Sequence, residues 1–126
     1  MPKNIRYALG AGLVLLLLFF GCHRRQIELA NGYKLTWLSR HRISITDPAR
    51  GGSPLIDGNV EQYAVSAPFI VGYASTNHIN AGTNAVAGYF ILRTDNRERL
   101  QALPDADWTN ELNRIHWANP PLQQVP

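Results

Sequence analysis

Apolar and polar residues alternate along much of the chain with the two-residue period of β-strands. The alternation covers residues 27–29 and 33–37, on either side of Asn31-Gly32. Because Asn and Gly both tolerate positive φ angles, this dipeptide suits the type I′ turn of a β-hairpin. Another alternating run at residues 42–46 predicts a further strand with one buried face.

The central part of the chain contains a long loop followed by two strongly apolar regions. Residues 47–59 are dense in Gly, Pro, Asp and Asn, which is typical of a loop. Residues 60–75 are apolar again, and Pro68 is expected to interrupt a strand or to lie at its edge. Residues 85–95 form the most continuous apolar run beyond the N-terminus, which predicts a central strand covered on both faces.

The C-terminal region has the periodicity of an amphipathic helix within residues 104–117. Asp105 or Asp107 is expected to cap its N-terminus by accepting hydrogen bonds from the first backbone N–H groups. Two consecutive prolines prevent further helix, and residues 122–126 are expected to form a loose tail. The apolar stripe of the helix consists of Trp108, Leu112 and Ile115.

Together these patterns predict an α+β fold, with one small antiparallel sheet of about five or six strands and one C-terminal helix packed on it. Residues 22–126 would form a single domain, because about 100 residues suffice for one hydrophobic core. An N-terminal apolar helix, acting as a signal or an anchor, would precede this domain.

The N-terminus has the three-part organisation of an export signal. Two basic residues precede an apolar run from Ala8 to Phe20, and Gly21-Cys22 follows it. A helix of this length covers only about two thirds of the hydrocarbon core of a bilayer. The run therefore fits the hydrophobic region of a signal better than a full membrane span.

The four residues Phe19-Phe20-Gly21-Cys22 resemble the lipobox of bacterial lipoprotein precursors. Gly21 and Cys22 match the usual pattern, whereas Phe19 and Phe20 stand where Leu and a small residue are usual. The resemblance implies cleavage after Gly21, so that residues 1–21 are a signal peptide. It also implies a diacylglyceryl group on Cys22, often with a fatty acid such as palmitate on the new α-amine, which would anchor the protein in the cell envelope.

Lipidation also accounts for the single Cys of the chain. One Cys cannot form an internal disulfide, and a thioether removes a free thiol that is reactive in an oxidising compartment. Two alternatives stay open, an uncleaved anchor formed by the run from Ala8 to Phe20 and a cleaved, soluble secreted protein. All three place the residues from Gln26 onward outside the cytoplasm.

The charge of the folded part argues against one class of partners. The chain has a formal net charge of +3, with 12 Lys and Arg against 9 Asp and Glu. Lys3 and Arg6 belong to the leader, so the rest of the chain is nearly neutral. Nucleic-acid-binding domains usually carry a strong or clustered positive charge, and we therefore expect no nucleic-acid partner.

No residue pattern predicts catalysis, a metal site or a cofactor. The four His residues are scattered, and no two are spaced to place metal ligands on one helix face. Neither a Gly-x-Ser-x-Gly nucleophile motif nor a phosphate-binding Gly-rich loop occurs. We expect a non-catalytic protein without metal or cofactor, and a small hydrolase is the least favoured alternative.

Three features are candidates for binding a protein partner. The loop of residues 75–84 is rich in Asn and Thr and connects two apolar strands, a common place for recognition. Arg40 and Arg42 would point to one face of a strand and suit phosphate headgroups or an acidic partner. Trp117 follows the helix next to Asn and Pro and could be exposed as a contact. Each feature also has an ordinary explanation. The loop residues would satisfy turn geometry, the arginines would pair with Asp47 or Glu61, and Trp117 would be buried. The candidate partner-binding residues are Asn77, His78, Asn80, Arg40, Arg42 and Trp117.

The sequence thus predicts a small envelope lipoprotein whose domain binds another protein, as an inhibitor, an immunity-type partner or an accessory subunit does. The alternative is a structural component of the envelope whose main property is its anchor. In both cases the membrane is a partner, reached through the lipid on Cys22 or through the apolar run.

Overall fold

The structure, a computed structural model, describes residues 25–76 and 86–126 of the chain. Its strands form two antiparallel sheets, with the orders β1-β2-β3 and β7-β6-β5-β4-β8. One α-helix, α2 (Asp105–Arg114), follows β7, and a short 3₁₀ helix, η1 (Pro48–Arg50), follows β3. The strands are β1 (Gln26–Glu28), β2 (Lys34–Ser39), β3 (Arg42–Thr46), β4 (Asn59–Ser66), β5 (Phe69–Ser75), β6 (Gly88–Arg93), β7 (Arg99–Leu103) and β8 (Gln123–Gln124).

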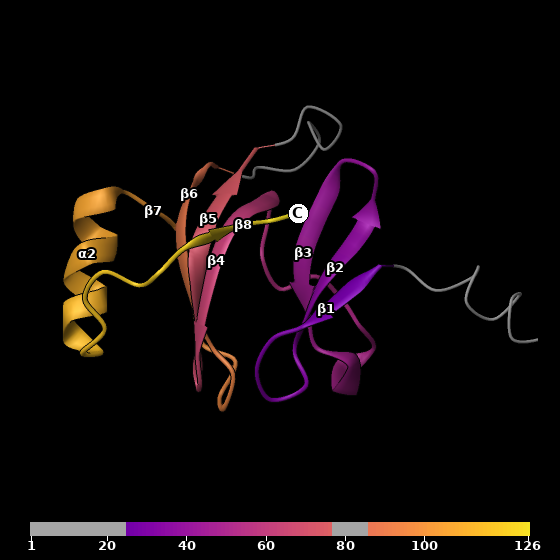
Figure 1. Cartoon of the computed structure of the whole chain (residues 1–126), viewed down its shortest axis with the longest axis horizontal. Coiled ribbons are helices and arrows are strands. Elements are labelled where there is room, and N and C mark those ends of the chain that lie inside the picture. Colours follow the sequence, from indigo (N-terminus) through magenta and orange to yellow (C-terminus); the bar gives the residue numbers. More distant parts are fainter. Residues whose placement is uncertain (1–24, 77–85) are drawn as a thin grey trace, which may run out of the picture.

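The domain has three layers, α2, the five-stranded sheet and the three-stranded sheet, with the larger sheet in the middle (Figure 1). The predicted antiparallel β-structure with one C-terminal helix is confirmed. The prediction of a single sheet of five or six strands is wrong, because the described chain has eight strands in two sheets. The apolar run from Ala8 to Phe20 lies outside the described residues.

The sheets are separate because loop backbone and an asparagine side chain, and not the backbone of a neighbouring strand, bind the outer edge of β3. The N–H of Leu55 donates to the carbonyl of Ile45 at 2.8 Å. Further along the same edge, the N–H of Ile43 donates to the side-chain oxygen of Asn59 at 2.7 Å. These bonds satisfy backbone groups that a neighbouring strand would otherwise pair with, so β4 begins a second sheet.

The connection between β1 and β2 confirms the predicted hairpin. Asn31 and Gly32 have φ angles of 53° and 80°, the pair of positive values that a type I′ turn needs. The N–H of Tyr33 donates to the carbonyl of Ala30 at 2.9 Å and closes the turn. The side-chain amide of Asn31 then donates to Oγ1 of Thr94 at 2.6 Å, which joins this turn to the five-stranded sheet.

The five-stranded sheet has a buried core on each face. Successive residues of β6 point alternately to these cores, Phe90 and Leu92 toward the three-stranded sheet and Ile91 toward α2. Both faces of β6 are therefore covered, as predicted, and β5 in the middle of the sheet is covered in the same way. The buried residues between the sheets are Tyr33, Leu35, Ile45, Ile56, Val60, Tyr63, Ile70, Ala74, Phe90 and Leu92.

The helix packs on the sheet through the predicted apolar stripe. Trp108 and Leu112 are buried, and Ile115 packs against the same cluster. The ring of Trp108 stacks on Tyr89 with 4.3 Å between ring centroids, and its Nε1 donates to the carbonyl of Phe90 at 3.2 Å. This bond satisfies an indole N–H that burial removes from water.

The N-terminus of α2 differs from the prediction. Pro104 occupies the N-cap position and makes no side-chain hydrogen bond, so neither Asp105 nor Asp107 caps the helix. Both acids lie in the first turn, where negative charge interacts favourably with the positive end of the helix dipole. The two carboxylates thus stabilise the helix end by their charge, and not by capping.

The C-terminal residues belong to the larger sheet, so the prediction of a loose tail is wrong. Two residues of β8 pair with Gln62 and Tyr63 of β4. The N–H of Val125 donates to the carbonyl of Glu61 at 2.9 Å, and its side chain packs against the inter-sheet core. Val125 therefore adds apolar surface to the core at the edge of the sheet.

An ion pair also joins the two sheets near the β6–β7 turn. Nε of Arg97 donates to Oδ2 of Asp47 at 2.9 Å, and the side chain of Asp47 is only 7% exposed. This hydrogen bond raises the pKa of Arg97 above its ordinary value, so the guanidinium stays charged. Asp47 also accepts from the N–H of Ala49 at 3.1 Å as the N-cap of η1.

Candidate functional site

The predicted loop residues Asn77, His78 and Asn80 lie outside the described residues, and so do Gly21 and Cys22. Their roles in partner binding, cleavage and lipid attachment stay predictions. The two strands that flank the loop, β5 and β6, are neighbours in the larger sheet.

Arg40 and Arg42 lie at the connection between β2 and β3. Arg40 is exposed and belongs to the turn, whereas Arg42 is the first residue of β3, so the two do not share a strand as expected. Nε of Arg42 is shielded from solvent and has no hydrogen-bond partner within the described residues. Neither arginine forms an ion pair within that part of the chain, and the acid expected nearby, Asp47, is bound to Arg97.

Trp117 has a structural role at the end of α2. His116 adopts a left-handed φ of 60°, and its N–H donates to the carbonyl of Asn113 at 3.1 Å. The N–H of Trp117 donates to the carbonyl of Leu112 at 2.9 Å, which completes a Schellman motif. The motif turns the half-buried Trp117 against the cluster under α2. Trp117 follows α2, and Arg40 lies between β2 and β3. These elements form opposite outer layers of the domain, so the fold does not bring the two residues together (Figure 1).

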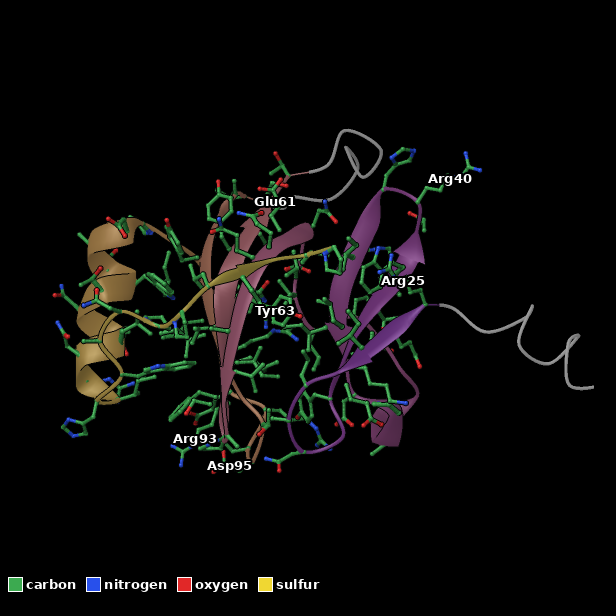
Figure 2. The ribbon with its side chains drawn as sticks, in the orientation of Figure 1. Arg25, Arg40, Glu61, Tyr63, Arg93 and Asp95 are labelled. Carbon is green, nitrogen blue, oxygen red and sulfur yellow. The ribbon has the colours of Figure 1, made fainter. Side chains whose placement is uncertain are left out.

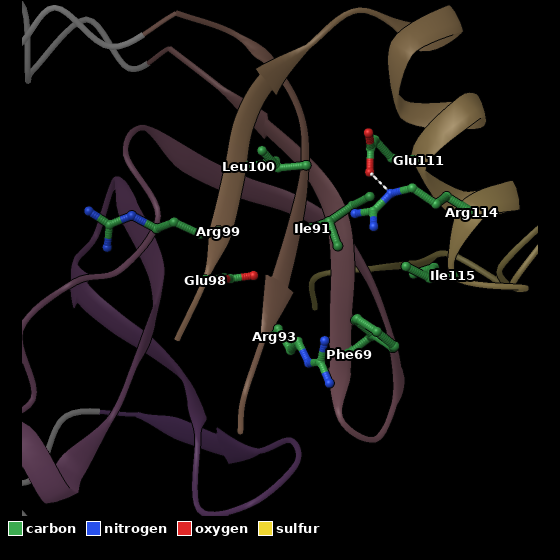
Figure 3. Close-up of a pocket in the computed structure, with 9 residues that line it drawn as sticks. All are labelled: Phe69, Ile91, Arg93, Glu98, Arg99, Leu100, Glu111, Arg114 and Ile115. Carbon is green, nitrogen blue, oxygen red and sulfur yellow. Dashed lines mark hydrogen bonds and ion pairs between the residues drawn. The ribbon is translucent and has the colours of Figure 1, made fainter. Parts of the chain in front are cut away.

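The fold does form a groove between the five-stranded sheet and the C-terminal half of α2 (Figure 3). Its volume is about 480 Å³, which lies within the usual range of about 300–1,000 Å³ for ligand pockets. We call it the helix groove. It is lined by Phe69, Ile91, Arg93, Glu98, Arg99, Leu100, Glu111, Arg114 and Ile115.

The floor of the helix groove is apolar and incompletely covered. Phe69, Ile91 and Leu100 come from three neighbouring strands, and Ile115 comes from the end of α2. Ile91 is buried, whereas Leu100 is 41% exposed. Among the described residues, the exposed large hydrophobic side chains are Leu100 and Val86. An exposed leucine beside a cavity offers apolar surface that a ligand can cover.

Charged side chains form the rim of the helix groove. Nε of Arg114 donates to Glu111 at 2.8 Å, and Nε of Arg93 donates to Asp95 at 2.7 Å. Both pairs are exposed, so each contributes little to stability. A guanidinium has five N–H donors in a planar fork, and each of these pairs uses the Nε donor. The rim therefore retains donors that suit a carboxylate of a ligand.

The strand β7 contributes to the groove and also forms one edge of the five-stranded sheet. Edge strands present backbone N–H and C=O groups that an extended segment of another chain can pair with. Figure 3 shows Leu100 facing the helix, while Arg99 points to the other side of the strand. A segment paired with this edge would therefore have Leu100 as its apolar neighbour on the helix side.

No pattern in the sequence predicted these groove residues. One signal was present in Leu100, an apolar residue within the polar segment of residues 95–101. The proximity of Arg93 to Arg114 and Glu111 depends on how α2 folds back over the sheet, which no local pattern encodes.

Searches of the described part of the chain for grouped metal-ligating side chains and for membrane-spanning helices found neither. No group of three His, Cys, Asp or Glu side chains there could hold a metal ion. No helix within residues 25–76 and 86–126 is long and apolar enough to cross a membrane. Comparison with known proteins finds no family, no curated protein and no solved structure that matches this chain.

Proposed function

We propose that this chain is a small lipoprotein of the cell envelope whose domain binds a protein partner without catalysis. The lipid would be attached to Cys22 after cleavage behind Gly21, as the resemblance of residues 19–22 to a lipobox implies. An uncleaved run from Ala8 to Phe20 would also hold the domain at a membrane. The helix groove is the observation that supports partner binding.

The helix groove suits an apolar side chain of a partner. Its volume of about 480 Å³ admits a large side chain, and the exposed Leu100 next to buried Ile91 provides the contact surface. Burial of a Leu, Ile or Phe side chain contributes about 1.5–3 kcal/mol. Since micromolar binding requires about 8 kcal/mol, polar contacts at the rim and backbone pairing must contribute as well.

The rim favours a partner segment that carries a carboxylate beside the apolar residue. Arg93 and Arg114 retain N–H donors next to the floor, and charge-assisted bonds to carboxylates are stronger than neutral ones. We therefore expect an extended segment that pairs with the edge of β7. Its apolar side chain would lie against Leu100 and its carboxylate near Arg114.

The position of the helix groove agrees with a tethered binding protein. The groove belongs to the α2 layer, whereas the chain enters the domain through β1 in the opposite outer layer (Figure 1). Residues 22–24, which we call the tether, would connect the lipid to the domain. A partner can therefore reach the groove while the tether holds the opposite side of the domain at the membrane.

Selection from a displayed library of random peptides against the full chain in detergent micelles tests the groove. We expect the enriched peptides to share an apolar residue next to Asp or Glu. Leu100→Asp should lower their affinity at least tenfold, because it removes apolar contact and repels the carboxylate, and about 1.4 kcal/mol corresponds to a factor of ten. Arg114→Glu should weaken the same peptides.

Val86→Asp is the matched control, because Val86 is the other exposed large hydrophobic residue of the described chain, at 68% exposure, and does not line the groove. Its affinity for the selected peptides should equal that of the original chain. Enrichment of peptides without acidic residues, or equal losses for Leu100→Asp and Val86→Asp, would contradict the groove as the binding site.

The anchor has a separate test in the intact mass of protein extracted from membranes. A lipoprotein has the mass of the chain from Cys22 onward plus its acyl groups. An unprocessed chain that begins at Met1 and carries no acyl mass would exclude lipidation and favour the uncleaved anchor.

A further inference from the structure

A second surface lies at the end of the domain where the tether enters. It comprises Arg25, Arg40 and Arg42, and we call it the basic tip. The carbonyl of Arg25 accepts from the N–H of Trp37 at 3.0 Å, and Trp37 in turn pairs with Ile43 of β3. This register puts Arg25 two strand spacings, about 10 Å, from the beginning of β3. Figure 2 shows Arg25 and Arg40 in the same outer layer.

The charges of the basic tip are not neutralised within the described residues. The ion pairs found there all involve other arginines. The guanidinium of Arg25 lies over the ring of Trp37 at 4.3 Å, which leaves its positive charge in place. Arg42 is partly exposed, whereas its Nε is shielded from solvent without a hydrogen-bond partner in that part of the chain. A contact of Arg42 with a surface would therefore be made by its terminal N–H groups. An anionic surface outside the domain would compensate these charges.

The tether is too short to keep the basic tip far from a membrane. Arg25 lies three positions after Cys22, and three extended residues span at most about 11 Å. With a lipid on Cys22, Arg25 therefore lies within roughly one or two Debye lengths of the headgroups, because that length is about 8 Å at physiological ionic strength. Arg24 adds another positive charge to the tether.

We propose that the basic tip binds anionic lipid headgroups of the membrane that holds the tether. The inference rests on the proposed function only for the anchor, and it does not depend on the helix groove. Planar guanidinium groups donate paired hydrogen bonds to phosphate, and Arg40 lies exposed at the turn where it can reach a surface. Tether and basic tip together give two attachments, so the domain keeps one orientation on the membrane.

This orientation turns the helix groove away from the membrane. Figure 2 shows Arg40 and Arg93 at opposite corners of the molecule, and Arg93 belongs to the rim of the groove. Headgroup binding at the basic tip would therefore present the groove to a partner in the surrounding compartment.

Hydrogen–deuterium exchange of the full chain in vesicles tests the basic tip. The vesicles consist of phosphatidylcholine alone or with one third phosphatidylglycerol. We expect slower exchange of the amides of residues 38–43 only in the phosphatidylglycerol vesicles. Each arginine near an anionic surface raises the binding equilibrium constant by a factor of about five. In the Arg40→Gln/Arg42→Gln variant, the ratio of membrane-bound to free tip should therefore fall about thirtyfold. Salt at about 1 M should have the same effect, because it shortens the Debye length to about 3 Å.

The control variant is Arg99→Gln/Arg114→Gln, which removes two arginines outside the basic tip and should keep the protection. Amides of β5 and β6 should exchange equally in all variants, which verifies folding. Equal exchange of residues 38–43 in both vesicles would overturn the inference, and so would protection that requires added membrane proteins, since the ligand would then be an acidic protein. Flotation of the protein with vesicles of pure phosphatidylcholine reports on the anchor alone. If the protein did not float with these vesicles, both the proposed anchor and this inference would be overturned.

Discussion

The two faces of the five-stranded sheet are covered in different ways. On one face a second sheet covers Ile70, Phe90 and Leu92, which are at most 1% exposed. On the other face a ten-residue helix covers Ile91 but leaves Leu100 41% exposed. A helix of this length extends only about 15 Å. The single helix therefore leaves a groove where a second sheet would have closed the surface.

Polar contacts follow the same division. On the inter-sheet side, the ion pair of Arg97 with Asp47 and the hydrogen bond of Asn31 with Thr94 join the two sheets. On the helix side, the ion pairs lie at the rim of the helix groove and are exposed. The inter-sheet side thus serves stability, while the helix side keeps the mixture of apolar and charged groups that binding surfaces use.

The largest effect should come from the inter-sheet core. Phe90→Ala removes a ring that is 1% exposed in the middle of that core, and we expect it to lower the free energy of unfolding by about 4 kcal/mol. Because Phe90 contacts residues of both sheets, the whole domain should lose stability together. Urea unfolding of the full chain in detergent, followed by tryptophan fluorescence, measures the change. A loss below about 1 kcal/mol would mean that the sheets are not packed on each other.

Trp108→Ala should have a somewhat smaller and more local effect. The change removes the stacking on Tyr89 and the hydrogen bond to the carbonyl of Phe90, and we expect a loss of about 3 kcal/mol. Hydrogen exchange should speed up most in α2, while the amides of β5 and β6 keep their protection through the inter-sheet core. Equal acceleration in helix and sheet would show that the two cores are one cooperative unit, against the division described above.

Local patterns predicted most of the elements of this fold. The Asn31-Gly32 turn, the doubly covered strand around Phe90 and the helix stripe at Trp108 and Leu112 all follow from short-range periodicity and turn chemistry. The division into two sheets does not follow from local patterns, because it depends on which groups bind the backbone at the edge of β3. The prediction of a loose tail at residues 122–126 was wrong for a similar reason. Val125 can pack against the core only when β4 provides a sheet edge for the C-terminal residues to pair with.

The candidate site was less predictable than the fold. Among its residues, only Leu100 departs from its sequence surroundings, and the others look like ordinary strand or helix residues. The groove arises from the length of α2 and its path over the sheet, which are properties of the assembled domain. Trp117 shows the converse: an aromatic residue that suggested a contact surface takes part in ending and packing the helix.

A smaller effect is expected for the ion pair between the sheets. Arg97→Ala leaves the carboxylate of Asp47 without its charged partner in a site where that side chain is 7% exposed, and we expect the urea midpoint to fall. Arg93→Ala is the matched control, because its pair with Asp95 is exposed and should contribute at most about 1 kcal/mol. Urea midpoints of the two variants give the comparison. Equal losses would remove the distinction between a stabilising inter-sheet pair and exposed groove pairs.

The smallest effect should come from the helix groove, where Leu100→Ala is expected to change the free energy of unfolding by no more than about 0.5 kcal/mol. Leu92→Ala is the matched comparison, because Leu92 follows Ile91, the residue of β6 that pairs with Leu100. The side chain of Leu92 is fully buried, so the same substitution should cost about 2–5 kcal/mol there. Both values follow from urea unfolding under one condition. If Leu100→Ala destabilised the domain as much as Leu92→Ala, Leu100 would be a core residue, and the groove would lose the apolar surface that its binding role requires.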